Sequence, residues 1–174
     1  RKVGRMKFPR LLVLSTLAAG LLLGPVTPAS ARPDLSRTDA PRIAGPVKVV
    51  AVGDIACQPG QEPTSDSCRQ AATARLASKV APDAVLALGD TQYERGAFKA
   101  FQGSYDKSWG ALKGITAAIP GNHEYGTAGA EGFYRYFGLS SPGYGVTTLG
   151  AWRVYLLNSN CAFIDCGAER AWLE

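Results

Sequence analysis

Three short apolar runs stand out along the chain, and each ends in a glycine that is followed by a polar residue. The runs occupy residues 47–54, 83–90 and 114–122. An unbroken apolar run of this length, bounded by turn residues, is typical of a strand that is buried on both faces of a sheet. The pattern therefore predicts three buried strands in this part of the chain.

Residues 65–80 have the spacing of an amphipathic helix. Ser67 and Gln70 are placed as a capping box, in which two side chains bond backbone N–H groups at the start of a helix. We expect the apolar positions that follow to form the buried face of this helix. These positions are Ala71, Ala74, Leu76 and Val80.

Further helices are predicted at residues 97–112, 129–139 and 168–174, and a β-hairpin is predicted at 143–160. Gly138 is expected to end the second of these helices, because glycine readily adopts the left-handed conformation found at helix C-termini. The sequence shows no internal repeat. Strands that alternate with helices indicate the α/β class with a largely parallel sheet.

The beginning of the chain differs from the rest in composition. Basic residues precede an apolar run at 11–24, and the tripeptide Ala-Ser-Ala at 29–31 matches a signal-peptidase site. The run is shorter than the roughly 20 residues that a bilayer span requires. Residues 1–31 are therefore predicted to be a secretory signal peptide, and the proline-rich stretch 32–46 a linker. A retained membrane anchor is the alternative.

The formal net charge of +5 comes from the start of the chain. Five of the 19 basic residues precede residue 11, so 14 basic and 14 acidic side chains remain from residue 32 onward. A balanced charge without a basic patch does not favour nucleic-acid binding. We expect no nucleic-acid partner and, after cleavage of the signal peptide, no stable membrane anchor. The sequence makes no prediction of the oligomeric state.

The four cysteines form two local pairs, Cys57 with Cys68 and Cys161 with Cys166. Each pair would close a short loop, and disulfides persist in the oxidising compartments that exported proteins reach. A zinc site is the alternative, but neither pair has the C-x-x-C spacing of zinc ligands. We therefore expect two disulfides and a secreted or periplasmic protein.

The polar residues that end the three apolar runs are candidates for a metal site. They are Asp54, Asp90 and Asn122, and His123 follows directly. The carboxyl ends of parallel strands face one crevice, and the preceding glycines allow the backbone to approach a ligand closely. Neighbouring carboxylates repel each other unless a cation neutralises them, and oxygen-rich clusters suit Mn, Fe, Zn or Mg. Each motif alone is also compatible with a simple turn, but the ordered set favours a metal site.

The motifs GDIAC, GDTQYERG and PGNHEYG resemble, in this order, those of the calcineurin-like metallophosphoesterases over roughly residues 47–160. The resemblance is most specific to the purple acid phosphatase branch. The broad superfamily pattern begins Asp-x-His, but Ala56 stands in the place of that histidine. Tyr93, three residues after Asp90, matches the Gly-Asp-x-x-Tyr motif of the branch.

The resemblance implies an α/β fold that corresponds to the N-terminal half of a four-layer α/β/β/α sandwich, incomplete at the C-terminus. Residues 47–174 would then be a truncated catalytic domain. It also implies that Asp54 binds a first metal ion and that Asp90 bridges two metal ions. Tyr93 would bind the first metal as a phenolate, which favours iron, and Asn122 would bind the second, which could be Fe, Mn or Zn.

The same resemblance implies the catalytic roles. His123 would face the substrate phosphate and stabilise, or protonate, the departing alkoxide, and Glu124 would hydrogen-bond the ring and orient it. The implied function is that of a secreted phosphoesterase, which hydrolyses small phosphate esters with a hydroxide activated by two metal ions.

The family pattern continues with a histidine and a Gly-His-x-His motif that this sequence lacks, since His123 is its only histidine. We therefore expect weak metal binding and negligible activity from this stretch alone. We interpret it as the front part of a longer enzyme, because the ligands of every motif within its bounds are kept. The alternatives are a non-catalytic secreted α/β binding protein derived from that scaffold and an unrelated binding module.

Overall fold

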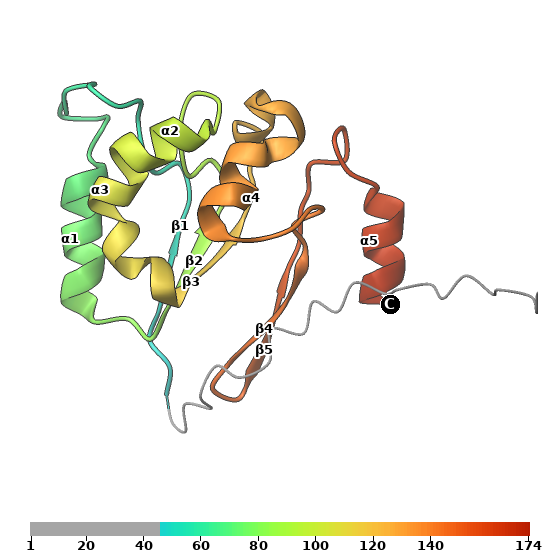
Figure 1. Cartoon of the computed structure of the whole chain (residues 1–174). Coiled ribbons are helices and arrows are strands. Elements are labelled where there is room, and N and C mark those ends of the chain that lie inside the picture. Colours follow the sequence, from blue (N-terminus) through green and yellow to red (C-terminus); the bar gives the residue numbers. More distant parts are fainter. Residues whose placement is uncertain (1–45) are drawn as a thin grey trace, which may run out of the picture. The chain divides into compact units, whose positions relative to one another are not determined.

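The computed structural model describes residues 46–174. The predicted signal peptide lies outside the described residues, and so does the predicted linker except for Pro46. Within the described part, three parallel strands form a sheet in the order β1-β2-β3 (Figure 1). The strands are β1 (Val49–Val52), β2 (Ala84–Leu88) and β3 (Thr116–Ile119). The predicted α/β class with a parallel sheet is confirmed.

The register of the sheet places the carboxyl ends of the three strands at one edge. Val85 of β2 lies opposite Val50 of β1 and Thr116 of β3. Two residues further along, Ala87 pairs with Val52 on one side and Ala118 on the other. The loops that follow the three strands therefore begin side by side.

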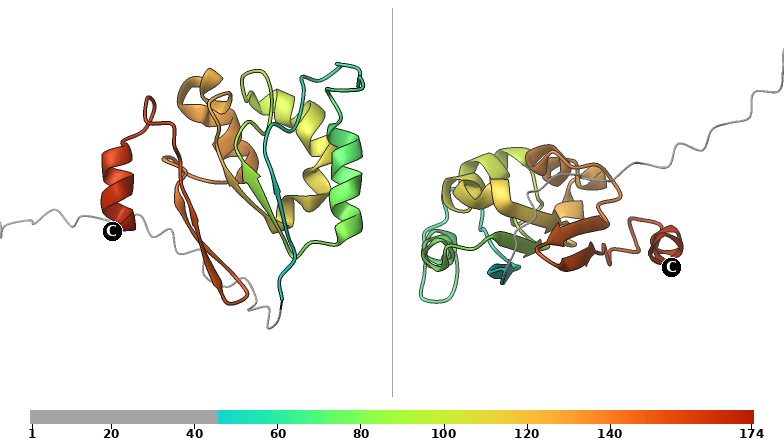
Figure 2. Two further views of the ribbon diagram at one scale, coloured as in Figure 1. Left: turned by 180° about the vertical axis from the view of Figure 1, so that it is seen from behind. Right: turned by 90° about the horizontal axis from the view of Figure 1, so that it is seen from below.

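Helices cover one face of this sheet, as the front and back views show (Figures 1 and 2). The helical elements between β1 and the hairpin are α1 (Gln70–Val80), α2 (Phe98–Ala100), η1 (Phe101–Tyr105), α3 (Asp106–Ser108), η2 (Gly110–Ile115), η3 (Glu124–Gly126), η4 (Ala128–Ala130) and α4 (Glu131–Phe137). Aromatic side chains fill the space between these helices and the small side chains of the sheet. They include Phe101, Tyr105, Trp109, Phe133, Tyr136 and Phe137.

The second face of the sheet is only partly covered by described residues. Val49 of β1 is 41% exposed and Leu88 of β2 is 54% exposed. β1 is an edge strand, and the helices before the hairpin cover only the first face of the sheet (Figures 1 and 2). The prediction that β1 is buried on both faces is therefore wrong. The apolar run thus predicted the strand correctly, but it did not predict how deeply the strand is buried.

The first long helix begins later than the sequence predicted. Cys68 has a left-handed backbone (φ 57°), so α1 starts only at Gln70. Ser67 does not cap this helix; its hydroxyl and backbone N–H both bond the hydroxyl of Thr64. The predicted capping box is therefore wrong.

The buried face of α1 also differs from the prediction. Ala74 and Ala77 are buried, whereas Leu76 is 67% exposed and Val80 is exposed as well. Successive helical residues are rotated by about 100°, so a helix that packs through Ala74 and Ala77 turns Leu76 toward solvent. The two small side chains make the contact.

The rest of the described chain forms a hairpin and a final helix, as predicted. The hairpin consists of β4 (Gly145–Leu149) and β5 (Trp152–Leu156), and α5 spans Cys166–Leu173. Gly138 ends α4 with a φ of 67°, which confirms its predicted role. None of the helices in the described part of the chain has the length and apolar character needed to cross a membrane.

Two disulfides close loops on either side of the fold. Cys57 is bonded to Cys68, in the loop before α1, and Cys161 is bonded to Cys166 at the start of α5. Both predicted pairings are confirmed.

Candidate functional site

The ends of the three parallel strands open into a pocket with a volume of about 180 Å³. Asp54 follows β1, Asp90 follows β2 and Asn122 lies three residues after β3, and all three line this pocket. Ser159 and Asn160, which follow β5, line it as well. The structure therefore brings three of the four predicted metal ligands together.

Both aspartates of the pocket have a left-handed backbone. The φ angle is 53° at Asp54 and 46° at Asp90. A residue with a side chain rarely adopts this conformation, and such strain is concentrated at functional sites. The sharp turn at the end of β1 and β2 is thus made by the aspartate itself and presents its carboxylate to the pocket.

Glycines let two of the strand ends pack against each other. A Cβ atom on Gly121 would overlap with the backbone and carboxylate of Asp90. A Cβ atom on Gly89, where φ is +95°, would lie only 2.8 Å from the Cα of Gly121, which is too close. The close approach is thus between the ends of β2 and β3, whereas the sequence suggested an approach to a ligand.

Tyr93, the fourth predicted ligand, lies beside the pocket and reaches its first carboxylate. Its hydroxyl donates a hydrogen bond of 2.5 Å to Oδ1 of Asp54. Burial raises the pKa of Tyr93 well above its ordinary value, and the bond to Asp54 and the nearby Asp90 raise it further. Tyr93 therefore holds its proton and acts as a hydrogen-bond donor in this arrangement.

His123 is anchored next to Asp90. Its backbone N–H donates to Oδ1 of Asp90 over 2.9 Å, and its ring packs against that of Tyr93 with a centroid distance of 4.4 Å. The Nδ1 atom lies 2.7 Å from the carbonyl oxygen of Glu94. Because a carbonyl only accepts, Nδ1 carries a proton, and Nε2 is the ring atom left to exchange a proton with another molecule.

Glu94 was not recognised from the sequence. Its carboxylate lies 4.0 Å from Nδ1 of His123, so it can pair with the ring when the ring is protonated. The only signal was its place directly after Tyr93 in the second motif.

Glu124 does not orient the His123 ring, and this expectation is wrong. Its carboxylate is fully buried and accepts hydrogen bonds from the Thr91 hydroxyl and from the backbone N–H groups of Gln92 and Gly121, at 3.0, 3.0 and 2.7 Å. Burial raises the pKa of Glu124, and these hydrogen bonds partly oppose the increase. Glu124 thus ties the loop after β2 to the turn after β3.

Gln92 is a second residue whose role the sequence did not reveal. Its buried Nε2 donates to the carbonyl oxygens of Ala56, Cys57 and Tyr93, at 3.2, 2.9 and 2.8 Å. Its Oε1 accepts from the backbone N–H of Tyr105 over 3.1 Å. One side chain therefore connects the loops after β1 and β2 to the helix that covers them. The motif offered no signal for this role beyond a polar residue next to Tyr93.

The donors at the strand ends suit a hard or borderline cation but do not complete a coordination shell. They comprise two carboxylates, one amide and one phenol. Within residues 46–174, no three or more His, Cys, Asp or Glu side chains are grouped so that they alone could hold a metal ion. Zinc takes about four ligands, and Mn or Mg about six. A bound cation would therefore need further donors from water, from the substrate or from other parts of the protein.

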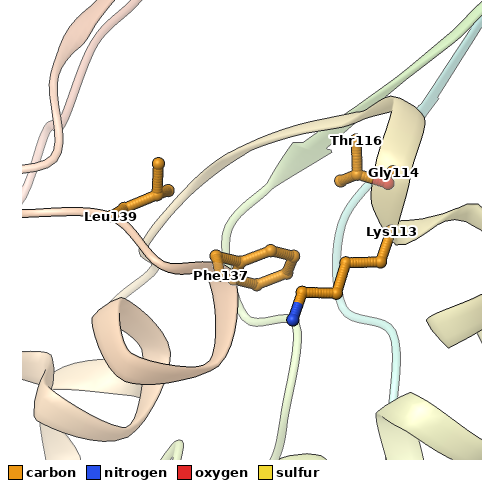
Figure 3. Close-up of a pocket in the computed structure, with 5 residues that line it drawn as sticks. All are labelled: Lys113, Gly114, Thr116, Phe137 and Leu139. Atoms are coloured by element: carbon orange, nitrogen blue, oxygen red, sulfur yellow. The ribbon is translucent and has the colours of Figure 1, made fainter.

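A second pocket, of about 240 Å³, lies away from these strand ends (Figure 3). It is lined by Lys113, Gly114, Thr116, Phe137 and Leu139. Thr116 starts β3, so this pocket is at the opposite end of the strand from Asn122. Its lining contains no carboxylate and does not offer the donors that a cation requires.

Comparison with known proteins identifies a family for this part of the chain. The family model described as calcineurin-like phosphoesterase matches residues 47–166, which is well over half of the chain and includes all three strand ends. No curated protein matches the chain.

Proposed function

The chain belongs to the calcineurin-like phosphoesterase family, and on this basis we propose that its strand-end pocket hydrolyses phosphate esters with the help of two metal ions. The observation that carries the proposal is the convergence of Asp54, Asp90 and Asn122 on one pocket, with His123 bonded to Asp90. The family suggests a small phosphate ester as the substrate, and the pocket, with a volume of about 180 Å³, would hold its phosphate group.

The proposed ligands divide between two positions. Asp54 and Tyr93 would hold one metal ion, Asn122 the other, and Asp90 would contact both. When bound, the metal ions would supply positive charge that polarises the phosphate and activates water. The left-handed backbone of the two aspartates already directs them to the pocket. Tyr93 would have to release the proton that it now donates to Asp54 before its oxygen could bind a metal.

We further propose that His123 protonates the leaving group. The hydrogen bond from Nδ1 to the Glu94 carbonyl fixes the ring and leaves Nε2 to carry the transferred proton. A proton on Nε2 makes the ring cationic, and the Glu94 carboxylate, 4.0 Å from Nδ1, stabilises that charge. His123 would then donate this proton to the departing alkoxide.

Replacing His123 with alanine tests the function and this role together. We expect the full-length protein to hydrolyse an alkyl phosphate in the presence of Mn²⁺, and His123→Ala to lower the turnover number by about 100-fold. The loss should be smaller for p-nitrophenyl phosphate, because nitrophenolate leaves without being protonated. The metal content, measured by elemental analysis, should stay the same, since the imidazole is not a proposed ligand.

Three outcomes would count against these assignments. Failure of the metal-loaded full-length protein to hydrolyse any phosphate ester would contradict the function. Loss of metal in the variant, or an equal loss of turnover with both substrates, would contradict the role of His123.

The match of Gly-Asp90-x-x-Tyr93 supports a finer proposal, that the protein is of the purple acid phosphatase type with iron next to Tyr93. We expect iron-loaded protein to show a visible phenolate-to-iron absorption band that Tyr93→Phe abolishes. The phenylalanine would keep the packing against His123 and lose only the hydroxyl. Tyr144→Phe, the same change at a residue that packs on Trp172, should leave the band unchanged. A colourless iron-loaded protein, or a band that persists in Tyr93→Phe, would refute this assignment.

Export is part of the proposal as well. Disulfides persist in oxidising compartments outside the cytoplasm, so the two disulfides of this chain support a secreted or periplasmic location. Residues 1–31 would direct this export and be removed, and residues 32–46 would link the cleavage site to the domain.

A further inference from the structure

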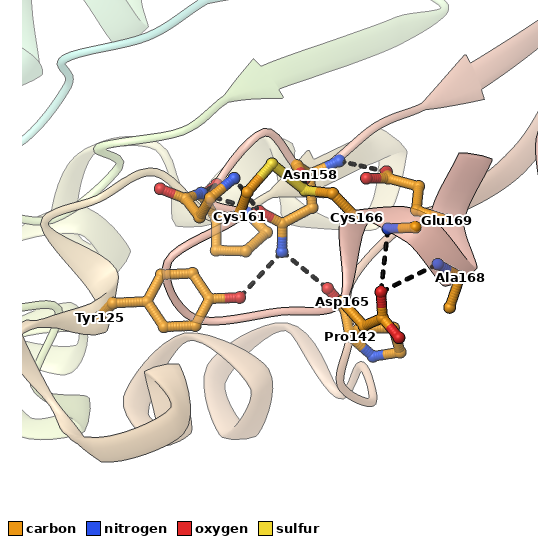
Figure 4. The surroundings of a disulfide bond; sticks show 11 residues. Tyr125, Pro142, Asn158, Cys161, Asp165, Cys166, Ala168 and Glu169 are labelled. Atoms are coloured by element: carbon orange, nitrogen blue, oxygen red, sulfur yellow. Dashed lines mark hydrogen bonds between the residues drawn. A yellow bond between two sulfur atoms is a disulfide. The ribbon is translucent and has the colours of Figure 1, made fainter.

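A buried polar network adjoins the strand-end pocket, and its centre is Asn158 (Figure 4). The Nδ2 atom of this fully buried residue donates to the hydroxyl of Tyr125 over 2.8 Å and to the carbonyl of Pro142 over 2.7 Å. Its backbone N–H donates to Oε1 of Glu169 over 2.6 Å. Asn158 thereby joins the end of the hairpin to η3 and to α5. A buried amide with its hydrogen bonds satisfied defines one geometry for the segments that it connects.

Asn160 extends this network to the pocket. Its Nδ2 donates to Oδ1 of Asn158 over 2.7 Å and to the carbonyl oxygen of Pro120 over 3.0 Å. Both hydrogens of the amide are used in this way, which determines the orientation of the side chain. Pro120 begins the turn that carries Asn122, and Asn160 itself lines the pocket.

A disulfide connects the segment that carries Asn160 to the start of α5. Cys161, the next residue, is bonded to Cys166 at the start of α5. The Asp165 side chain caps this helix by accepting hydrogen bonds from the backbone N–H groups of Gly167 and Ala168. The disulfide and the cap limit how far the segment can move away from the pocket.

Three side-chain hydrogen bonds hold the turn that presents Asn122, and one of them runs from the N–H of His123 to Oδ1 of Asp90. On one side, Glu124 accepts a hydrogen bond from the N–H of Gly121. On the other, Asn160 donates to the carbonyl of Pro120. Because Asn122 is itself exposed, the position of its amide depends on the backbone of this turn.

We propose that Asn160 is a positioning residue for the Asn122 side of the pocket, and that its hydrogen bond to Pro120 fixes the turn from which Asn122 would bind a cation. The inference rests on the proposed function, because it assigns Asn160 to the metal site of that function. Asn160 acts through Pro120 and contacts neither the metal nor the phosphate.

Amide hydrogen exchange tests the proposal. In Asn160→Ala we expect the N–H groups of Gly121 and His123 to exchange about tenfold faster, because the turn opens locally more often. The amides of β1 and β2 should keep their rates. Ser159→Ala, which alters the neighbouring pocket residue without touching the bond to Pro120, should have no effect. If Asn160→Ala does not fold, Asn160→Asp can replace it, since it keeps the size of the side chain and removes the donor.

Mn²⁺ affinity provides a second readout. Asn160→Ala should bind Mn²⁺ about tenfold more weakly than the wild type, in the range found when residues that support metal ligands are changed. Exchange rates that stay unchanged, or that rise equally at all amides, would overturn the proposal, because the role of Asn160 would then be absent or purely structural. If the wild-type protein does not bind Mn²⁺ at all, the proposed function fails, whereas the exchange rates still decide whether Asn160 fixes the turn.

Discussion

Replacing Asp90 with asparagine is expected to weaken Mn²⁺ binding by about 100-fold or more. Mutating a residue that only supports a metal ligand already lowers metal affinity by about 10- to 100-fold, and a direct ligand should matter at least as much. Asp90 follows the central strand, and its carboxylate is the group proposed to contact both metal ions. Asparagine tolerates the left-handed backbone at this position, and its Oδ1 can still accept the hydrogen bond from the N–H of His123. The loss would therefore report on the carboxylate charge rather than on the backbone. Isothermal titration calorimetry measures the affinity.

A matched control is available in the loop before α1. Asp66 is exposed and lies in the segment closed by the Cys57–Cys68 disulfide, so Asp66→Asn makes the same change in net charge away from the pocket. This variant should bind Mn²⁺ like the wild type. Equal affinities of Asp90→Asn and the wild type, or equal losses in both variants, would show that the cation does not bind at the strand ends.

Replacing Gln92 with alanine is expected to lower the free energy of unfolding by about 3 kcal/mol, as buried groups left without partners each cost about 1–3 kcal/mol. The variant would remove the hydrogen bonds that Gln92 makes with the N–H of Tyr105 and the carbonyl of Cys57. The carbonyl of Ala56 would also lose its bond to Gln92 but would keep the one from the N–H of Tyr93. It would also leave a cavity beneath the loop that carries Tyr93. Denaturant unfolding, followed by far-UV circular dichroism, measures the change.

Gln102→Ala is the control for this experiment. Gln102 lies in η1, the same helical segment as Tyr105, but its side chain is exposed. Its replacement should change the free energy of unfolding by less than about 0.5 kcal/mol, as is usual at the surface. A similarly small effect of Gln92→Ala would mean that water replaces the amide in these hydrogen bonds.

The sequence predicted the position of the pocket because the two features that define it are local. An apolar run indicates a strand, and a polar residue after the run lies at the carboxyl end of that strand. In a parallel sheet these ends meet, so Asp54, Asp90 and Asn122 could be placed together without any knowledge of side-chain contacts. Both disulfides could be predicted for a similar reason, since each closes a short loop.

The contacts that hold the pocket could not be predicted, because they join residues far apart in the sequence. Glu124 stands next to His123 in the motif, yet its carboxylate accepts hydrogen bonds from Thr91 and Gln92, which lie 33 and 32 residues earlier in the chain. Asn160 reaches Pro120, 40 residues earlier in the chain. Adjacency in the sequence suggested that Glu124 orients the histidine, but burial directed its carboxylate to backbone donors instead.

Burial itself was predicted less well than secondary structure. The apolar character of β1 and of Leu76 indicated the right elements, but the buried face depends on which neighbours pack against each element. On α1 the contact is made by Ala74 and Ala77, and the larger Leu76 lies in solvent. Periodicity defines a helical face, whereas tertiary packing selects the part of that face that is buried.

The central claim is that the ends of β1, β2 and β3 form a metal site. Anomalous diffraction from crystals of the protein grown with Mn²⁺ would test it most directly, because the anomalous signal locates the cation independently of any activity. We expect an anomalous peak in the pocket, in contact with Asp54, Asp90 and Asn122. A saturating concentration of Mn²⁺ that gives no peak there, or a peak only elsewhere on the protein, would contradict the claim.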